Sequence, residues 1–465
     1  MHTSIRARHR AVLLAAATLA AATAGTASAT AASTGPTAPD KLFNGYQHCS
    51  TDPSAPTYLW GTDGLVLEGV PQDSAAAGSE FGAQYLLWPV SAPTQTTTYT
   101  SNITSYPAGF EAAANIPGSA LTDGTTYAWQ ARSLIGGSAV SKWSRTCYIA
   151  IDDEGPSSAP TITSANYPAG VSTPGGTPVQ LTFGADGVSD VAGYEFVWDT
   201  GDLSVYGVSI GAGGVPEPKS PWADTKDYVQ APSLGGSASL SLVPPPGWGP
   251  HTLTVVSLDR AYNISARSTY EIWLQSTAPT ITPAVANPQF DTPTKFTFTP
   301  NATAEAASPI VSYSVSIGGG TPRTVKAGAD GSATVSLKLD NVYGSDGVSV
   351  TSTSANGWVS DPAQEYYYFD TTPIVNSNDY PEYSTSGGVG VPGTFTFTHQ
   401  VPNIVSYTYS FDNGATETTV AADKAGDAQI TWAPPTGASY YDLNVYGTTK
   451  DGLKLLSTDY YFGVN

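Results

Sequence analysis

The chain has few charged and few sulfur-containing residues. Only 12% of its 465 residues are Asp, Glu, Lys or Arg, and it contains one Met and two Cys. Helix surfaces favour Glu, Lys, Gln and Ala, and no segment shows sustained helical periodicity, so the composition argues against a helical protein. The many Thr, Ser, Gly, Pro and Tyr residues instead favour exposed faces of β-sheets and the turns between strands.

Basic residues are scarce as well. The sequence holds 18 Lys and Arg against 38 Asp and Glu, a formal net charge of −20. An acidic surface repels phosphate backbones and anionic lipid headgroups, so we expect no nucleic-acid partner. Beyond the N-terminal region no apolar run is long enough to span a bilayer, so we expect no membrane insertion.

The N-terminus has the order of a secretory signal peptide. Arg6, Arg8 and Arg10 precede the apolar run 11–20, which small residues follow up to Ala29. This order predicts a signal peptide at 1–29 and an exported protein, with a flexible leader at 30–40. Removal of three Arg and no acidic residue changes the formal charge to −23. The sequence leaves open whether the extracellular protein is retained at the cell wall.

The two cysteines, Cys49 and Cys147, predict one disulfide, because thiols seldom stay reduced outside the cell. Cys147, Ile149 and Ile151 alternate along one strand-like run, so the Cys147 sulfur should face the core. Such a bridge would tie the first strand of its domain to the last. Closing a loop of this size contributes roughly 4 to 5 kcal/mol in the chain-entropy model.

Two aromatic strand-like runs recur three times. In both, apolar side chains occupy every second position, as expected for strands with one buried face. The first run occurs at Thr177–Phe183, Thr294–Thr299 and Thr394–Thr398. The second run occurs at Tyr194–Trp198, Tyr313–Ile317 and Tyr407–Phe411.

The repeats predict an all-β fold of tandem antiparallel β-sandwiches in an extended arrangement, joined by Pro-marked linkers. The Asn356-Gly357 and Asp451-Gly452 dipeptides predict tight hairpin turns. The predicted domains are 41–153, 154–276 with a loop insertion at 200–236, 277–370 and 371–465.

Two segments resemble known families. Residues 120–132, followed by Ser141–Ser144, resemble the second half of a fibronectin type III domain, with Leu121 and Tyr127 at the positions that flank its turn. The likeness covers 41–153 and implies a tyrosine-corner hydrogen bond from Tyr127. The phrase Ser257–Ser265 resembles the last hairpin of bacterial immunoglobulin-like domains, and similar modules occur in exported and surface proteins of actinobacteria.

Catalytic patterns are weak. Gly207-Val-Ser-Ile-Gly211 matches a nucleophile elbow around Ser209, but the Gly- and Pro-rich residues that follow cannot start the required helix. The three histidines after the signal peptide fall in different predicted domains, and no two carboxylates are paired by the sequence. The acidic run Asp152–Glu154 is better interpreted as solvated linker charge than as a calcium site. We therefore expect no enzyme, no cofactor and no metal.

Four aromatic residues in or beside the insertion are the candidate ligand-binding residues: Tyr206, Trp222, Tyr228 and Trp248. Flat exposed rings suit sugar faces, whereas the interpretation we favour is that these rings pin the insertion to its sandwich. The family resemblances imply a secreted, non-catalytic structural, adhesion or protein-interaction protein. The alternative is an extracellular polysaccharide-binding protein that uses these rings, and an enzyme with an unrecognised loop site is the third hypothesis.

Overall fold

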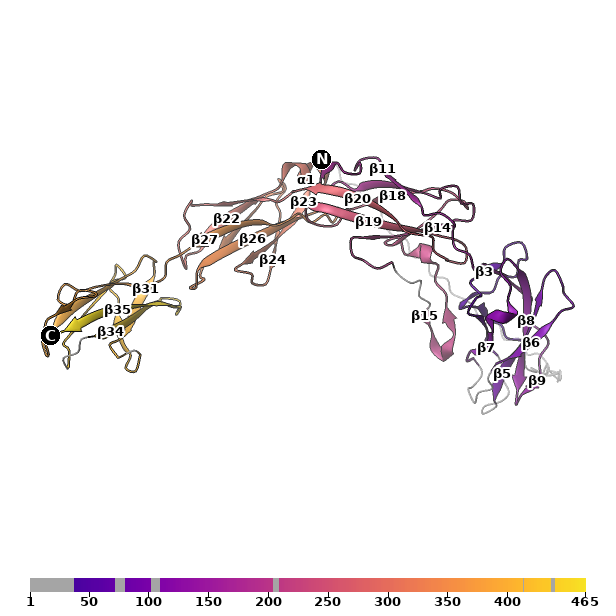
Figure 1. Ribbon diagram of the computed structural model, residues 1–465, viewed down its shortest axis with the longest axis horizontal. Coiled ribbons are helices and arrows are strands. Elements are labelled where there is room, and N and C mark those ends of the chain that lie inside the picture. Colours follow the sequence, from indigo (N-terminus) through magenta and orange to yellow (C-terminus); the bar gives the residue numbers. More distant parts are fainter. Residues whose placement is uncertain (1–36, 72–79, 102–108, 204–208, 413, 436–439) are drawn as a thin grey trace, which may run out of the picture. The chain divides into compact units, whose positions relative to one another are not determined.

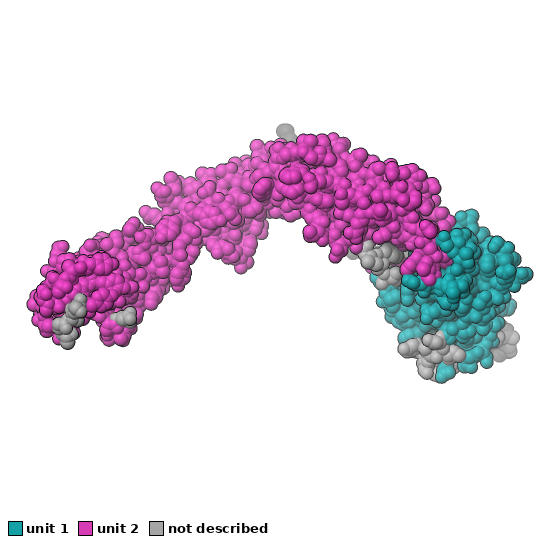
Figure 2. All heavy atoms as spheres, in the orientation of Figure 1, with its two compact units in different colours: residues 1–57, 63–150, 209–217 teal, residues 58–62, 151–208, 218–465 magenta. Residues whose placement is uncertain are grey.

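The computed structural model describes residues 37–71, 80–101, 109–203, 209–412, 414–435 and 440–465. Nearly all of its elements are strands in antiparallel sheets, so the predicted all-β class is confirmed (Figure 1). The chain divides into two compact units (Figure 2). The first contains residues 1–57, 63–150 and 209–217, and the second contains 58–62, 151–208 and 218–465. Tyr206 lies outside the described residues.

The first sandwich packs two sheets over a core that includes the fully buried Tyr85 and Trp129. A disulfide joins Cys49 to Cys147, as predicted, and Cys147 is 0% exposed. One sheet has the order β2(Gln47–His48), β1(Leu42–Asn44), β4(Leu65–Gly69), β7(Ala112–Ile116). The other has the order β3(Thr57–Leu59), β10(Cys147–Ile151), β8(Thr126–Ile135), β5(Phe81–Pro89), β6(Thr97–Thr100), with β9(Ser138–Ala139) paired to β8.

The second sandwich contains the first copy of the repeat. Val179, Leu181 and Phe183 are buried while the residues between them are exposed, so the predicted alternation is confirmed. One sheet has the order β11(Thr161–Ser164), β13(Val179–Gly184), β18(Ala238–Leu242). The other has the order β12(Ser172–Pro174), β20(Ser268–Gln275), β19(Gly249–Leu258), β14(Gly193–Trp198), β17(Tyr228–Gln230).

The third and fourth sandwiches repeat this plan, and the remaining predicted repeat strands are present. In the third, one sheet has the order β21(Thr280–Pro283), β22(Thr294–Thr299), β25(Ala333–Leu337). The other has the order β24(Arg323–Lys326), β23(Ile310–Ile317), β26(Ser345–Ser354), β27(Ala363–Tyr368). In the fourth, one sheet has the order β28(Ile374–Asn376), β30(Gly393–Thr398), β33(Ala428–Trp432). The other has the order β29(Thr385–Ser386), β35(Lys454–Val464), β34(Tyr441–Thr449), β31(Ile404–Ser410), β32(Thr418–Ala421).

A buried tyrosine explains why the second repeat strand is aromatic. Tyr194, Tyr313 and Tyr407 are each 0% exposed, and each packs its ring against a phenylalanine of the first repeat strand. Each hydroxyl donates to a glycine carbonyl in the turn before the next strand of the opposite sheet, at Gly236, Gly331 and Gly426 respectively. A tyrosine at this position therefore fills the core and satisfies a turn carbonyl with the same side chain.

A second repeated device is a pair of serines eight residues apart. In three sandwiches the later serine hydroxyl accepts the backbone N–H of the earlier serine, at 2.8–2.9 Å, and donates to the carbonyl that follows it. The pairs are Ser133 with Ser141, Ser257 with Ser265, and Ser352 with Ser360. The hydroxyl substitutes for a strand partner where the last two strands separate. This spacing was not predicted from the sequence.

Two elements were not expected from the sequence. The first is the six-residue helix α1(Ala302–Ala307), whose N-terminus is capped by the Asn301 side chain, which accepts the N–H groups of Thr303 and Ala304. In the insertion, β15(Ser209–Ile210) pairs with β16(Pro216–Glu217). This hairpin belongs to the first compact unit, where the Glu111 N–H donates to the Gly213 carbonyl at 2.9 Å.

Candidate functional site

In each of the last three sandwiches, the turn between the last two strands contacts residues that precede that sandwich in the chain. In the second sandwich this is the turn 259–263 between β19 and β20. The Asn263 side-chain amide donates to the Asp152 carbonyl at 2.7 Å. A side chain at Gly155 would collide with the Ile264 carbonyl, so the linker passes closely against the turn. Asp259 is fully buried and accepts the backbone N–H groups of Ala261 and Asn263, which fixes the turn; its burial raises its pKa to about 6.

The corresponding turn of the third sandwich inserts Trp358 into the second. Trp358 is 0% exposed and belongs to the hydrophobic core of the second sandwich, together with residues of β13, β19 and β20. Gly175 leaves the room that the indole ring occupies, because a Cβ there would overlap it. The second sandwich therefore completes its core with a residue of the third.

Polar contacts hold this joint in one arrangement. The Trp358 indole N–H donates to the Thr277 hydroxyl at 3.1 Å. The Asn356 amide donates to the Gly176 carbonyl at 2.9 Å. Asp361 accepts the Thr277 N–H at 2.8 Å and the Ser276 hydroxyl at 2.6 Å, so the linker before the third sandwich is bonded to that sandwich's last hairpin.

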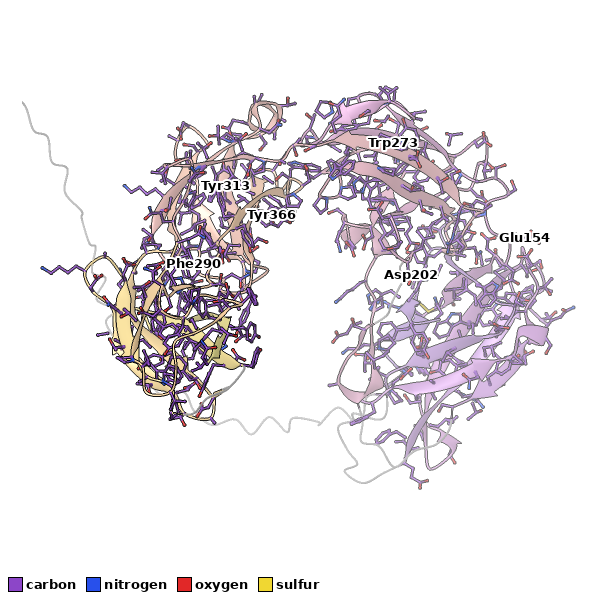
Figure 3. The ribbon with its side chains drawn as sticks, turned by 60° about the vertical axis from the view of Figure 1, so that its left-hand side comes forward. Glu154, Asp202, Trp273, Phe290, Tyr313 and Tyr366 are labelled. Carbon is purple, nitrogen blue, oxygen red and sulfur yellow. A yellow bond between two sulfur atoms is a disulfide. The ribbon has the colours of Figure 1, made fainter. Side chains whose placement is uncertain are left out.

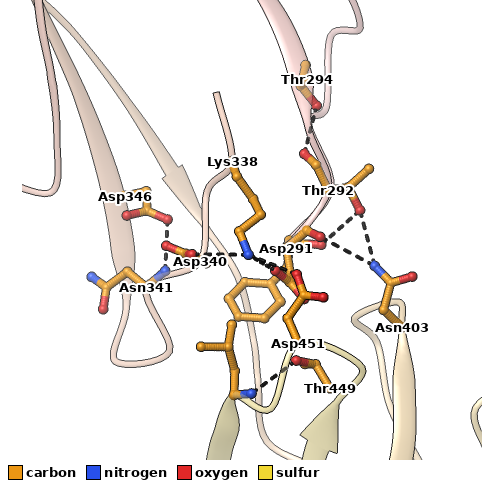
Figure 4. Close-up of polar contacts among 12 residues, drawn as sticks. Asp291, Thr292, Thr294, Lys338, Asp340, Asn341, Asp346, Asn403, Thr449 and Asp451 are labelled. Carbon is orange, nitrogen blue, oxygen red and sulfur yellow. Dashed lines mark hydrogen bonds and ion pairs between the residues drawn. The ribbon is translucent and has the colours of Figure 1, made fainter. Parts of the chain in front are cut away.

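The joint between the third and fourth sandwiches combines an apolar and an ionic contact. Phe290, which follows β21 and is labelled in Figure 3, is 1% exposed and packs in the core of the fourth sandwich. Beside it, the Lys338 ammonium lies 2.7 Å from an Asp291 carboxylate oxygen and 3.0 Å from Asp451, which belongs to the β34–β35 turn (Figure 4). These carboxylates raise the pKa of Lys338, so the lysine is charged throughout the neutral range.

An aromatic pocket lies at one end of the fourth sandwich, where β31, β33 and β34 end or begin. Its volume is about 370 Å³, and Tyr409, Phe411, Trp432 and Tyr441 are among its lining residues. Phe411 stacks on Trp432 with ring centroids 4.0 Å apart, and Tyr441 meets Trp432 edge to face at 5.1 Å. All four rings are partly buried and pack against the hydrophobic core of the fourth sandwich, which supports the pocket wall.

Asp412 is the charged residue of this pocket. Its Oδ1 accepts the Ser410 hydroxyl at 2.5 Å and the Thr416 N–H at 2.8 Å. The hydrogen bonds from Ser410 and Thr416 lower the pKa of Asp412 to about 2, so it carries a negative charge at any physiological pH. Among the described lining residues there is no lysine or arginine.

A polar groove of about 420 Å³ lies on the third sandwich, lined mainly by serine, glycine, Asn341 and Gln364. Tyr366 of β27, labelled in Figure 3, is 66% exposed, and its ring rests on Gly347 of the neighbouring strand. Its hydroxyl donates to the Gln364 side chain at 2.9 Å. The groove therefore offers one exposed ring and neutral hydrogen-bonding groups.

The three described aromatic residues among those predicted to bind ligand, Trp222, Tyr228 and Trp248, do not share one exposed surface. Trp222 is half-buried, covers Gly193 and meets Tyr228 edge to face at 6.3 Å. Tyr228 is only 7% exposed, which matches the interpretation that these rings pin the insertion to its sandwich. Trp248 is 69% exposed, and Gly247 before it donates its N–H to Val359 of the third sandwich. A ligand role for Trp248 stays a prediction.

The residues weighed for catalysis belong to different elements. Ser209 is in β15, opposite Glu217, and the three-residue 3-10 helix Ala212–Gly214 stands where a nucleophile elbow requires an α-helix. His251 lies 3.0 Å from Asp199, while burial of His399 lowers its pKa to about 4. Within the part of the chain that the structure describes, no group of three or more His, Cys, Asp and Glu is arranged to hold a metal ion. No helix among the described residues is long and apolar enough to cross a membrane.

One pair of carboxyl groups, which no sequence pattern predicted, lies close together in the first sandwich. Glu68 of β4 is fully buried and accepts the Tyr46 N–H at 3.1 Å. Burial, with the nearby Glu111 carboxyl, raises the pKa of Glu68 to about 8. Burial also raises the pKa of Glu111, and its hydrogen bond with Glu68 opposes that rise.

No family model and no curated protein matches the chain. Among solved structures it resembles a tetra-tandem repeat from the extending region of a large adhesion protein, at 16% identity and a TM-score of 0.20, covering 88% of this chain and 98% of that one. It also resembles the chicken CNTN1 FN1–FN3 domains, at 13% identity and a TM-score of 0.22, covering 67% and 100% respectively. A Ca²⁺-stabilized adhesin that helps an Antarctic bacterium bind ice matches at 13% identity and a TM-score of 0.21, covering 92% and 100%. Likenesses this low carry no argument about function.

Proposed function

We propose that the protein is a secreted, non-catalytic adhesion protein, in which consecutive β-sandwiches act as a stiff spacer for contact surfaces. The observation that carries this proposal is the insertion of Trp358 of the third sandwich into the core of the second. Domains in one chain are expected to move relative to each other unless their interface is large and hydrophobic. The buried Trp358 ring makes the interface of these two sandwiches hydrophobic at its centre.

The next joint supports the same function by a different contact. Phe290 is buried in the core of the fourth sandwich, and Lys338 links carboxylates on both sides of the joint. Both joints use the turn between the last two strands of the following sandwich. A chain that repeats this contact resists bending at each linker, which suits a spacer better than a set of independent domains.

Distance measurements between spin labels test the spacer function. Cysteines introduced at the exposed Thr182 of β13 and the exposed Gln364 of β27 place one label on the second sandwich and one on the third. We expect a single narrow distance distribution by pulsed electron paramagnetic resonance, and a broad one after Trp358→Ala. The matched control is Trp273→Ala, because Trp273 is 42% exposed on the second sandwich. A broad distribution in the unaltered protein would rule out a stiff spacer.

Polysaccharide binding is the second candidate function, and the groove beside Tyr366 is the observation that favours it. An exposed tyrosine ring next to neutral hydrogen-bonding side chains suits a hydroxylated, uncharged ligand. The test is depletion of the protein from solution by insoluble polysaccharides. Binding at this groove should be lost in Tyr366→Ala and kept in Tyr343→Ala, since Tyr343 is 82% exposed and does not line the groove.

A further inference from the structure

We propose that the aromatic pocket of the fourth sandwich binds the cationic side chain of a lysine or arginine presented by a basic segment of a partner protein. This inference deepens the proposed adhesive function, on which it rests, by naming the chemistry of the contact. It depends on three features of the pocket: its ring walls, a carboxylate that has no basic partner among the described lining residues, and the hydrogen bonds that hold this carboxylate.

The ring walls attract a cation. Tyr409, Phe411, Trp432 and Tyr441 line the pocket, and the face of an aromatic ring is electrostatically negative. The rings do not have to move on binding, because Phe411 stacks on Trp432 and Tyr441 stacks on the buried Phe462 with centroids 5.6 Å apart. A pocket formed in advance loses little conformational entropy when it is occupied.

Asp412 supplies the negative charge at this wall. Ser410 and Thr416 hold its Oδ1, and no described lining residue carries a positive charge to neutralise it. An anionic ligand would therefore be repelled.

A cation fits the pocket better than a sugar does. Sugar recognition needs free hydrogen-bonding groups around the ring walls, but the Ser410 hydroxyl and the Thr416 N–H are already used to hold Asp412. The charged group that the described lining presents to a ligand is the Asp412 carboxylate, among four rings and the hydroxyls of Thr418 and the two tyrosines. The volume of about 370 Å³ is at the lower end for small-molecule sites, which suits one long side chain with its flanking backbone.

The charge of the whole chain favours a partner protein as the source of the cation. The net charge of −20 attracts basic proteins and speeds their association at low ionic strength. A lysine or arginine in a basic segment would benefit from this field as well as from the pocket. Binding should therefore weaken as salt is added.

Fluorine NMR of the full chain labelled with 5-fluorotryptophan tests the proposal. The ten tryptophans give separate reporters, and Trp432→Phe assigns the signal of the pocket. The probes are N-acetyl-lysine N-methylamide, its arginine analogue, the uncharged N-acetyl-norleucine N-methylamide, and cellobiose. We expect the lysine and arginine amides to shift the Trp432 signal at much lower concentration than the norleucine amide, and cellobiose to leave it unchanged.

Two matched variants separate the charge from the fold. Asp412→Asn should weaken lysine binding by about fivefold, the effect of one charge pair about 4 Å apart in water, and should leave norleucine binding unchanged. Asp423→Asn is the control, since Asp423 is an exposed aspartate of the same sandwich that also accepts backbone N–H groups but does not line the pocket. The other tryptophan signals show whether each variant is folded.

Three results would overturn the proposal: equal binding of the norleucine and lysine amides, a Trp432 shift with cellobiose alone, or the same effect from both aspartate variants. None of them bears on the spin-label distances across the joint. Failure here would therefore remove the cationic partner and leave the stiff spacer in place.

Discussion

Replacement of Trp358 by alanine should destabilise the second sandwich, although Trp358 belongs to the third by sequence. The side chain is 0% exposed in the core formed by β13, β19 and β20, and its indole N–H bonds to Thr277. Removing a buried Trp or Phe side chain costs about 3 to 5 kcal/mol, since both the buried surface and the cavity contribute. That loss corresponds to a rise of roughly 100- to 5,000-fold in the population of the open state.

Hydrogen exchange followed by mass spectrometry measures this effect in the intact chain. Amides of β13 and β20 should exchange faster in Trp358→Ala by a factor in that range, whereas those of β4 and β7 in the first sandwich should not change. Trp273→Ala is the matched control, and its exposed ring predicts a small effect. If exchange accelerated only in β26 and β27, Trp358 would be a local residue of the third sandwich and the shared core would be refuted.

Three further predictions concern single contacts, each measured by urea denaturation. Replacing Cys49 and Cys147 by serine should destabilise the first sandwich by about 4 kcal/mol, because the disulfide closes a loop with a sequence separation of 98 residues. The pKa of Glu68 rises from 4.5 to about 8 on folding, so the folded state binds the proton more tightly; stability should fall as pH rises from 4.5 to 8, and Glu68→Gln should reduce that slope to the part that Glu111 contributes. Lys338→Met leaves the buried Asp291 carboxylate without its partner and should cost about 1 to 3 kcal/mol, less than a fully buried pair because Lys338 is partly exposed.

The chain offers tryptophan reporters and a control variant for these three stability measurements. Fluorinated Trp129, which is fully buried in the first sandwich, reports on the cysteine and Glu68 variants, and Trp432 reports on the lysine variant. Lys326→Met is the control for Lys338→Met, because Lys326 is exposed on β24. A pH slope that Glu68→Gln leaves unchanged, or equal losses in the two lysine variants, would contradict the assigned causes.

The regular part of the fold could be predicted from the sequence because it depends on local alternation. Phe296 and Phe298 are both 0% exposed, with the exposed Lys295 before them, as period two requires. The disulfide was predictable for the same reason, since Cys147 and Ile149 share a buried face. The boundaries of the four predicted domains stay predictions.

The candidate sites could not be predicted, because they depend on which residues lie opposite each other. A tryptophan in a loop can be a binding residue or a core residue, and the sequence around Trp222 does not distinguish these two roles. Here the deciding residue is Gly193, whose missing side chain leaves the space that the Trp222 ring covers. Gly175 does the same for Trp358, 183 positions further along the chain.

One signal was present in the sequence and could have been found. The serine pairs 133/141, 257/265 and 352/360 share a spacing of eight residues, and each later serine closes the end of a hairpin. In the third sandwich the hairpin tip between the paired serines carries Asn356 and Trp358, the two residues that contact the second sandwich. A search for this spacing would thus have located the joint.

The joint also explains why the proline-marked linkers do not mark where one core ends. The linker Ser276–Pro279 is where the chain passes from the second sandwich to the third, yet Trp358, about eighty residues later, completes the core behind that linker. Because Asp361 binds the linker residues Ser276 and Thr277 while Trp358 fills the core, the hairpin fixes the linker and the core together. Bending at this linker would have to withdraw a buried indole ring, so the stiffness of the joint and the stability of the second sandwich arise from the same side chain.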